Sequence, residues 1–107
     1  MWYNGFMAIK VYPNVTKESM GMLMAMGKIK PCSWVQEIGA VPAKPAGELA
    51  QGDMIVYNYG YTSEVLSATR HKSAVIVVTR TMETMSGVVG KTYERKYKAT
   101  TLIPVAV

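Results

Sequence analysis

The chain has 107 residues, of which half are apolar and 18% are charged, and its formal net charge is +5. This length is the usual size of one domain, and the composition excludes wholesale disorder. The only cysteine, Cys32, excludes an internal disulfide and a multi-cysteine zinc site, and it is typical of a reducing compartment, so we expect a cytoplasmic protein. The longest mostly apolar run, residues 20–27, is too short to span a bilayer, so no membrane partner is predicted.

The first part of the chain predicts one strand and one helix. Residues 8–12 alternate apolar with small or polar side chains, as in a short strand. Residues 16–26 predict a helix, because Thr16 can cap its N-terminus, Glu18 lies in the first turn and Gly27 follows its end. Four methionines recur here at every second position, so a strand remains the alternative. We expect these methionines to fill a core, with an adaptable binding surface as the alternative.

Prolines and glycines interrupt the region between residues 31 and 47. Residues 32–38 predict either a short turn of helix or an edge strand, and residues 40–46 predict a linker or an extended cover strand. We therefore divide the chain into residues 1–46, an N-terminal appendage with a linker, and residues 47–107, a small β-barrel. The appendage is too small to be stable alone, so it should pack on the barrel.

The second half of the chain predicts five short strands separated by turn residues. They cover residues 54–59, 62–69, 74–81 and 91–98, followed by a last strand that contains Pro104. The third is β-branched almost throughout, which is the strongest strand signal in the chain. In the fourth, Tyr93, Arg95 and Tyr97 share one face, and the lysines at 96 and 98 lie on the other.

The order of these features carries a resemblance to a known fold. Leu49-x-x-Gly52-Asp53-x-Ile55-Val56, a hairpin, a β-branched strand and a Thr-rich connection into Leu102-Ile103-Pro104-Val105 together resemble SH3-like barrel domains in small proteins of bacteria and their phages. The resemblance covers residues 47–107. It implies a mainly β fold with a short helix: a five-stranded antiparallel SH3-like barrel with the N-terminal strand and helix packed on it. It also implies the binding role of a phage accessory protein.

Catalysis and metal binding find little support in the residues. His71 is the only histidine, and its only possible nucleophilic partner, Cys32, lies in an element with no sign of being adjacent. The carboxylates are scattered without the spacing of a metal site. We therefore predict a protein that is not an enzyme and has no metal site and no cofactor.

Basic residues gather instead around the hairpin at 70–73 and along the fourth strand. Antiparallel pairing of the third and fourth strands would bring Arg80 towards Lys91 and the hairpin tip towards Lys98, which would merge the two groups. Tyrosines interleave with these cations, as on surfaces that neutralise phosphates and stack bases. The predicted nucleic-acid contacts are Arg70, Lys72, Arg80, Lys91, Arg95, Lys96 and Lys98 for phosphates, with Tyr59 or Tyr61 for stacking.

Two alternatives stay open. Strand alternation by itself predicts that Tyr93 and Tyr97 point into the barrel while Lys96 and Lys98 form a solvated outer face. The second functional hypothesis is a protein-interaction module, host-directed or virion-associated, that docks through the barrel edge near Pro104 or through the Met-rich helix. Nucleic acid and protein are therefore the two partner classes, and the residues do not specify an oligomeric state.

Overall fold

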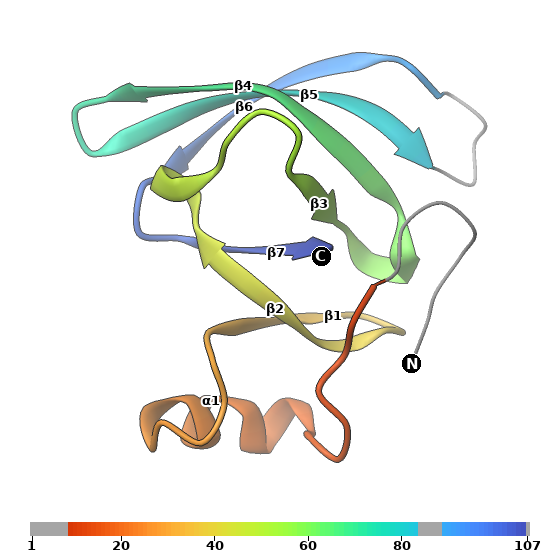
Figure 1. The fold of residues 1–107 in the computed structure, drawn as a ribbon, viewed down its shortest axis with the longest axis vertical. Coiled ribbons are helices and arrows are strands. Elements are labelled where there is room, and N and C mark those ends of the chain that lie inside the picture. Colours follow the sequence, from red (N-terminus) through yellow and green to blue (C-terminus); the bar gives the residue numbers. More distant parts are fainter. Residues whose placement is uncertain (1–8, 84–88, 107) are drawn as a thin grey trace.

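One sheet of antiparallel strands and one helix make up the fold. The computed structural model describes residues 9–83 and 89–106. Within these residues seven strands pair in the order β1-β2-β7-β3-β4-β5-β6 (Figure 1). The elements are α1 (Lys17–Ala25), β1 (Cys32–Val35), β2 (Gly39–Pro45), β3 (Met54–Val56), β4 (Thr62–His71), β5 (Ala74–Glu83), β6 (Thr92–Lys98) and β7 (Leu102–Ala106), with short 3-10 turns η1 (Ala46–Glu48) and η2 (Asn58–Gly60).

The helix forms where its local signals predict it. The Thr16 hydroxyl accepts a hydrogen bond from the Ser19 N–H, and the Ser19 hydroxyl accepts one from the Thr16 N–H, both at 3.0 Å. These two bonds satisfy N–H groups that a helix start otherwise leaves unpaired. Gly27 has a φ of +71°, a conformation that ends the helix at low cost. The helix prediction is confirmed, and the alternative of a strand is wrong.

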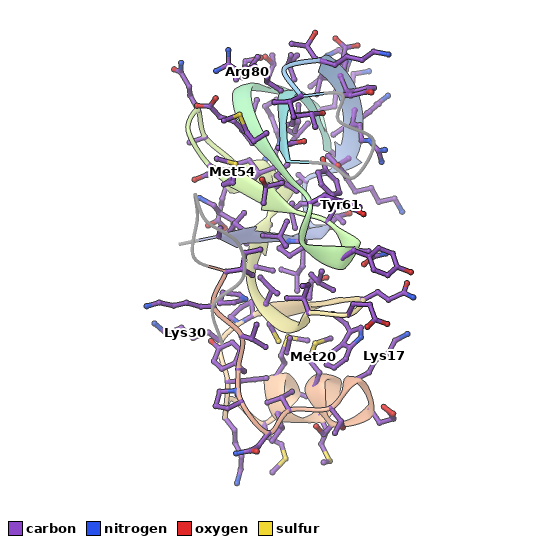
Figure 2. All side chains as sticks on the ribbon, turned by 90° about the vertical axis from the view of Figure 1, so that its right-hand side faces the viewer. Lys17, Met20, Lys30, Met54, Tyr61 and Arg80 are labelled. Carbon is purple, nitrogen blue, oxygen red and sulfur yellow. The ribbon has the colours of Figure 1, made fainter. Side chains whose placement is uncertain are left out.

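The methionines of α1 divide between a packed and an exposed face. Figure 2 shows Met20 between the helix and the β1–β2 hairpin, and its side chain is half-buried. Met24 is also half-buried, and its Sδ lies 3.2 Å from the Cys32 backbone N–H, which donates to it. Met22 and Met26 are 60% and 58% exposed. No residue of α1 is buried and none belongs to either apolar core cluster, so the prediction that the methionines fill a core is wrong.

The region between residues 31 and 46 contains two strands. β1 lies at the edge of the sheet, which confirms the edge-strand interpretation. β2 pairs with β1 and with β7, so it is part of the sheet and the linker interpretation is wrong. The boundary predicted at residue 46 thus falls within one continuous sheet.

The predicted N-terminal strand at residues 8–12 is not formed in its described part. Residues 9–12 belong to no strand, and residue 8 lies outside the described residues. Ile9 is completely buried, and the Tyr12 N–H donates to the Ala40 carbonyl at 3.0 Å. The segment is held by this burial and by a single hydrogen bond to β2, which is less than a strand ladder requires.

The five strands predicted after residue 52 are present as β3 to β7, but they do not close into a barrel. The outer strands of the sheet are β1 and β6. β7 pairs with β3 on one side and with β2 on the other, so β2 extends the sheet where closure would need β6. The fold is therefore a mainly β, open antiparallel sheet with one helix.

Two β-bulges curve this sheet over its main core. The register between β4 and β5 shifts between Thr62 and Ser63 and again between Val65 and Ser67, and bulges bend a strand and increase its twist. The concave side thereby encloses the larger apolar cluster: Ala46, Leu49, Ile55, Val65, Val75, Val77, Ala99, Ile103 and Val105. A smaller cluster, Ile9, Val35, Ile38, Val41 and Val56, fills the β1–β2 end.

Candidate functional site

A hollow opens on the concave side of β4, β5 and β6. Its volume is about 220 Å³, below the roughly 300–1,000 Å³ of pockets that hold a whole drug-sized ligand. It can therefore take one ring-sized group more readily than a complete cofactor. The lining residues in the described chain are Tyr57, Tyr61, Thr62, Ser63, Thr79, Thr81, Tyr93 and Arg95.

The floor of the hollow is the polar continuation of the core face of β5. Val75 and Val77 are buried in the main core, and Thr79 and Thr81 follow them on the same side of the strand. Ser63 of β4 lies directly opposite Thr81. The concave face thus changes from apolar to hydroxyl-bearing along its length, and the hollow lies at the polar end.

The wall formed by β6 comes from the odd-numbered residues of that strand. Tyr93 lies opposite Thr79, Arg95 opposite Val77 and Tyr97 opposite Val75. Lys96 and Lys98 lie on the convex side and are exposed. This arrangement confirms the prediction that alternation separates Tyr93 and Tyr97 from the two lysines.

The facing wall comes from the turn around η2. The Tyr57 N–H donates to the Tyr61 carbonyl at 2.7 Å, and the Tyr59 N–H donates to the Gln36 carbonyl at 2.9 Å, so the turn is tied to the β1–β2 hairpin. Tyr59 has a φ of +68°, which is uncommon for a residue with a bulky side chain. Its side chain is 42% exposed, and its ring centroid lies 6.3 Å from that of Tyr61. Two tyrosine rings therefore lie together beside the hollow.

The Tyr61 hydroxyl in this wall is a buried polar group. The Tyr61 Oη is buried, and among the described residues it has no hydrogen-bond partner. A buried hydroxyl without a hydrogen bond costs about 1–3 kcal/mol of desolvation. Tyr61 therefore combines a ring at the lining of the hollow with a buried hydroxyl that no described residue satisfies.

The charges at the hollow are positive. Within the described part of the chain, Arg95 and Lys91 form no ion pair. The Lys91 Nζ lies 5.4 Å from the centroid of the Tyr93 ring, in cation–π geometry. Burial raises the pKa of the Tyr97 hydroxyl, its neighbour Tyr57 raises it further, and the Arg95 guanidinium opposes both effects. Arg95 in the hollow and Lys91 at its border are thus two cations that form no ion pair with an acidic side chain of the described residues.

Three of the predicted basic residues lie on the convex side. Arg80 forms an ion pair with Glu64 at 2.7 Å, and Lys96 and Lys98 lie further along the same face. Figure 2 shows Arg80 at one end of the molecule and Tyr61 below it, towards the middle. The two labelled residues therefore belong to separate parts of the surface.

The hairpin residues occupy a third position. Lys72 lies at the tip of the β4–β5 hairpin, and the Arg70 Nε donates to its carbonyl at 2.9 Å. Arg70 lies opposite Val75, on the concave side but at the far end from Thr81. The pairing of β5 with β6 does bring this hairpin close to Lys98, as predicted. The nine predicted contacts are nevertheless divided between two faces and the hairpin tip, so one flat patch does not contain them all.

The sequence prediction places Tyr61 and Arg95 in the site but omits six lining residues. The omitted residues are Tyr57, Thr62, Ser63, Thr79, Thr81 and Tyr93. The threonines of β5 do have a signal in the sequence, because the inward-facing positions of this strand change from valine to threonine. The contribution of β4 has no such signal, because its adjacent apolar residues Val65 and Leu66 do not show which side of the strand faces inwards.

Other kinds of site are not evident in the described chain. No group of three or more His, Cys, Asp or Glu side chains gathers there in a metal-binding arrangement. Cys32 is buried, and this burial raises the pKa of its thiol. No helix of residues 9–83 and 89–106 combines the length and the hydrophobicity needed to cross a membrane. Comparison of the chain with protein-family models, curated proteins and solved structures finds no significant match.

Proposed function

We propose that the protein binds single-stranded nucleic acid in the concave hollow and catalyses no reaction. The observation that supports this most is the lining itself. Tyrosine rings, hydroxyl groups and an arginine without an ion pair in the described chain face the same small space. These are the groups that recognise an unstacked base and its phosphate.

A base would enter the hollow between β6 and the η2 turn. The ring of Tyr93 is 46% exposed and offers a face for stacking, and Tyr59 offers another outside the hollow. Base–aromatic stacking tolerates any sequence, since every base has a π-face. The protein should therefore bind with little sequence preference.

The backbone of the strand would follow the two cations of the hollow. Arg95 lines the hollow, and Lys91 lies over Tyr93 at its border. A duplex keeps its base faces stacked and out of reach of a concave surface, whereas a single strand can turn a base inwards. The geometry therefore favours single strands over duplexes.

Fluorescence anisotropy with a labelled oligo-deoxythymidine tests the proposal, with a duplex of the same length as comparison. We expect binding of the single strand at low salt and weaker binding of the duplex. At protein concentrations where the chain is monomeric, Arg95→Gln and Tyr93→Ala should each weaken binding, and Lys96→Gln, a matched change on the convex face, should leave it unchanged. Absence of binding at low salt, or equal losses for Arg95→Gln and Lys96→Gln, would contradict the proposal.

A second candidate is a protein-interaction module that uses α1. The observation in its favour is the exposure of Met22 and Met26, because flexible thioether side chains suit adaptable contacts. This function predicts a protein partner that stays bound in a high-salt wash and is lost when both methionines are replaced by glutamine. Retention of that partner by the double variant would exclude α1 as the contact.

The resemblance to SH3-like barrels of bacterial and phage proteins fits either binding role. We propose that β3 to β7 are an SH3-like unit whose closure is prevented by the insertion of β2 beside β7. An experimental structure tests this directly: a chain path that departs from the SH3-like order of strands would exclude the relationship.

A further inference from the structure

β6 is a seven-residue edge strand whose outer side pairs with no strand of residues 9–83 and 89–106. The Thr81 N–H donates to the Lys91 carbonyl at 2.9 Å, and the Ala99 N–H donates to the Ser73 carbonyl at 2.8 Å. Because hydrogen bonds alternate along an antiparallel pair, the odd-numbered residues of β6 bond to β5. The backbone groups of Thr92, Glu94, Lys96 and Lys98 therefore point to the outer side.

The sequence of β6 is complementary to a second copy of β6 that runs in the opposite direction. With two copies antiparallel and Arg95 opposite Arg95, Glu94 of each copy lies opposite Lys96 of the other. Tyr93 of each copy likewise lies opposite Tyr97 of the other. Opposite charges and aromatic pairs directly across from each other stabilise a sheet. Glu94 and Lys96 are exposed, and neither has an ion-pair partner among the described residues.

We propose that two copies of this chain pair through β6, in this register, to form a symmetric dimer with one continuous sheet. In this register the backbone groups of Glu94 hydrogen-bond with those of Lys96 in the other copy. The side chains of the same two residues form ion pairs on the convex face. The two-fold axis passes at Arg95. A two-fold interface uses the same patch on both copies, so this patch must be complementary to itself.

The dimer brings the two concave hollows side by side. The Arg95 residues face each other across the axis, and like charges directly opposite are destabilising. The pairing should therefore be weak and depend on concentration. An anion between the two guanidinium groups would strengthen it, so phosphate buffer should favour the dimer over a chloride buffer of equal ionic strength.

Charge exchange tests the proposal in solution. Analytical ultracentrifugation of the full chain should show a monomer–dimer equilibrium. Glu94→Lys and Lys96→Glu should each raise the dimer dissociation constant by roughly 30-fold, because both ion pairs become repulsive. Mixing these two variants restores both ion pairs and should produce the mixed dimer, and the double variant should dimerise alone. Circular dichroism of each variant checks that the fold is intact.

A cysteine pair tests the register. Facing residues of a non-hydrogen-bonded pair have Cα atoms about 4.5 Å apart, within the range that a disulfide spans. Arg95→Cys should therefore cross-link two copies on mild oxidation. Thr92→Cys is the control, because it keeps the Glu94–Lys96 ion pairs and in this register the two introduced thiols are offset along the strands and too far apart. Cys32 is buried and should not compete.

Three results would overturn the proposal. The first is a monomer at all concentrations for the native chain, and the second is a dimer whose stability is unchanged by the charge exchanges. The third is cross-linking of Arg95→Cys that is no faster than that of Thr92→Cys.

Discussion

The salt dependence of the proposed nucleic-acid binding distinguishes the concave hollow from the whole basic surface. Each phosphate neutralised on a single strand contributes about −0.7 to the slope of log K against log salt concentration. Arg95 lines the hollow and Lys91 lies over Tyr93 at its border, and these two cations predict a slope of about −1.4. Contact with all seven of the predicted cations would give a slope of about −4.9. The two surfaces therefore predict slopes that differ more than threefold.

One substitution sharpens this test. Arg95→Gln keeps a polar side chain and removes one charge from the hollow, so the slope should fall to about −0.7. Lys96→Gln removes one charge from the convex face, and we expect its slope to equal that of the native chain. Net charge decreases equally in both variants, so a general loss of positive charge cannot explain a difference between them.

The assay is a series of anisotropy titrations with a labelled oligo-deoxythymidine between about 50 and 200 mM salt, a range over which counterion release is readily measured. Protein concentrations must stay below the dimer dissociation constant, so that the slope reports one hollow. A native slope near −5, or a slope that Lys96→Gln lowers as much as Arg95→Gln does, would refute the assignment of the site to the concave side.

Three further predictions concern stability and reactivity. Gly39→Ala should lower the free energy of unfolding by about 1–3 kcal/mol, because the φ of Gly39 is +127° and a Cβ there would lie 2.7 Å from Val11 Cγ1. Gly21→Ala should raise the free energy of unfolding by about 0.5–1 kcal/mol, because Gly21 lies in α1 with open space around it. Urea unfolding measures both changes. Cys32 should react with a thiol reagent such as DTNB only as fast as the chain opens, because it is buried, and rapid reaction in native buffer would contradict this. The pKa of Tyr97 is raised, so the folded state holds the hydroxyl proton more tightly than the unfolded state does. This proton contributes fully to the free energy of unfolding below the ordinary tyrosine pKa of about 10. The contribution is lost as the pH rises through the pKa of Tyr97 in the folded state. Urea unfolding at alkaline pH in a Cys32→Ala background should show this loss, and Tyr97→Phe should flatten it.

Elements with strong local signals could be predicted from the sequence. α1 has its cap at Thr16 and its stop at Gly27 within the segment itself, and the β-branched run of β5 needs no distant partner to be recognised as a strand. Alternation along β6 also separates Arg95 from Lys96 without knowledge of the fold. These features depend on neighbours in the chain, so their patterns survive in the sequence.

Features that depend on distant pairing could not be predicted. β2 contains Pro42 and Pro45, which normally argue against an internal strand. Its first half pairs with β1 and its second half with β7, so each part of the strand has one paired side, and prolines are tolerated there. The open sheet could not be predicted for the same reason. β7 pairs with β2, and the composition of the β2 segment indicates a linker.

The hollow shows the same limit within the site. Arg95 and Tyr61 are predictable as contacts because cations and tyrosines interleave in the sequence. Ser63 faces Thr81 because of the register between β4 and β5, and the adjacent apolar residues Val65 and Leu66 leave the inward face of β4 undefined in the sequence. A one-residue slip in a strand moves each side chain to the other face. The hydroxyl groups of the site therefore follow from a register that only the folded sheet defines.

The odd-numbered and even-numbered residues of β6 face different sides of the sheet, so substitutions can separate the proposed binding in the hollow from the proposed self-association. Odd positions point into the concave side, where Arg95 lines the hollow, while the backbone groups of even positions point to the outer edge and their side chains lie on the convex face. Substitutions at Glu94 and Lys96 should therefore change self-association without touching the hollow. Arg95 is the exception, because the proposed two-fold axis brings both copies of it together. A bound phosphate would relieve that repulsion, so oligonucleotide should strengthen the dimer by the same factor as dimerisation strengthens oligonucleotide binding, since linkage is reciprocal.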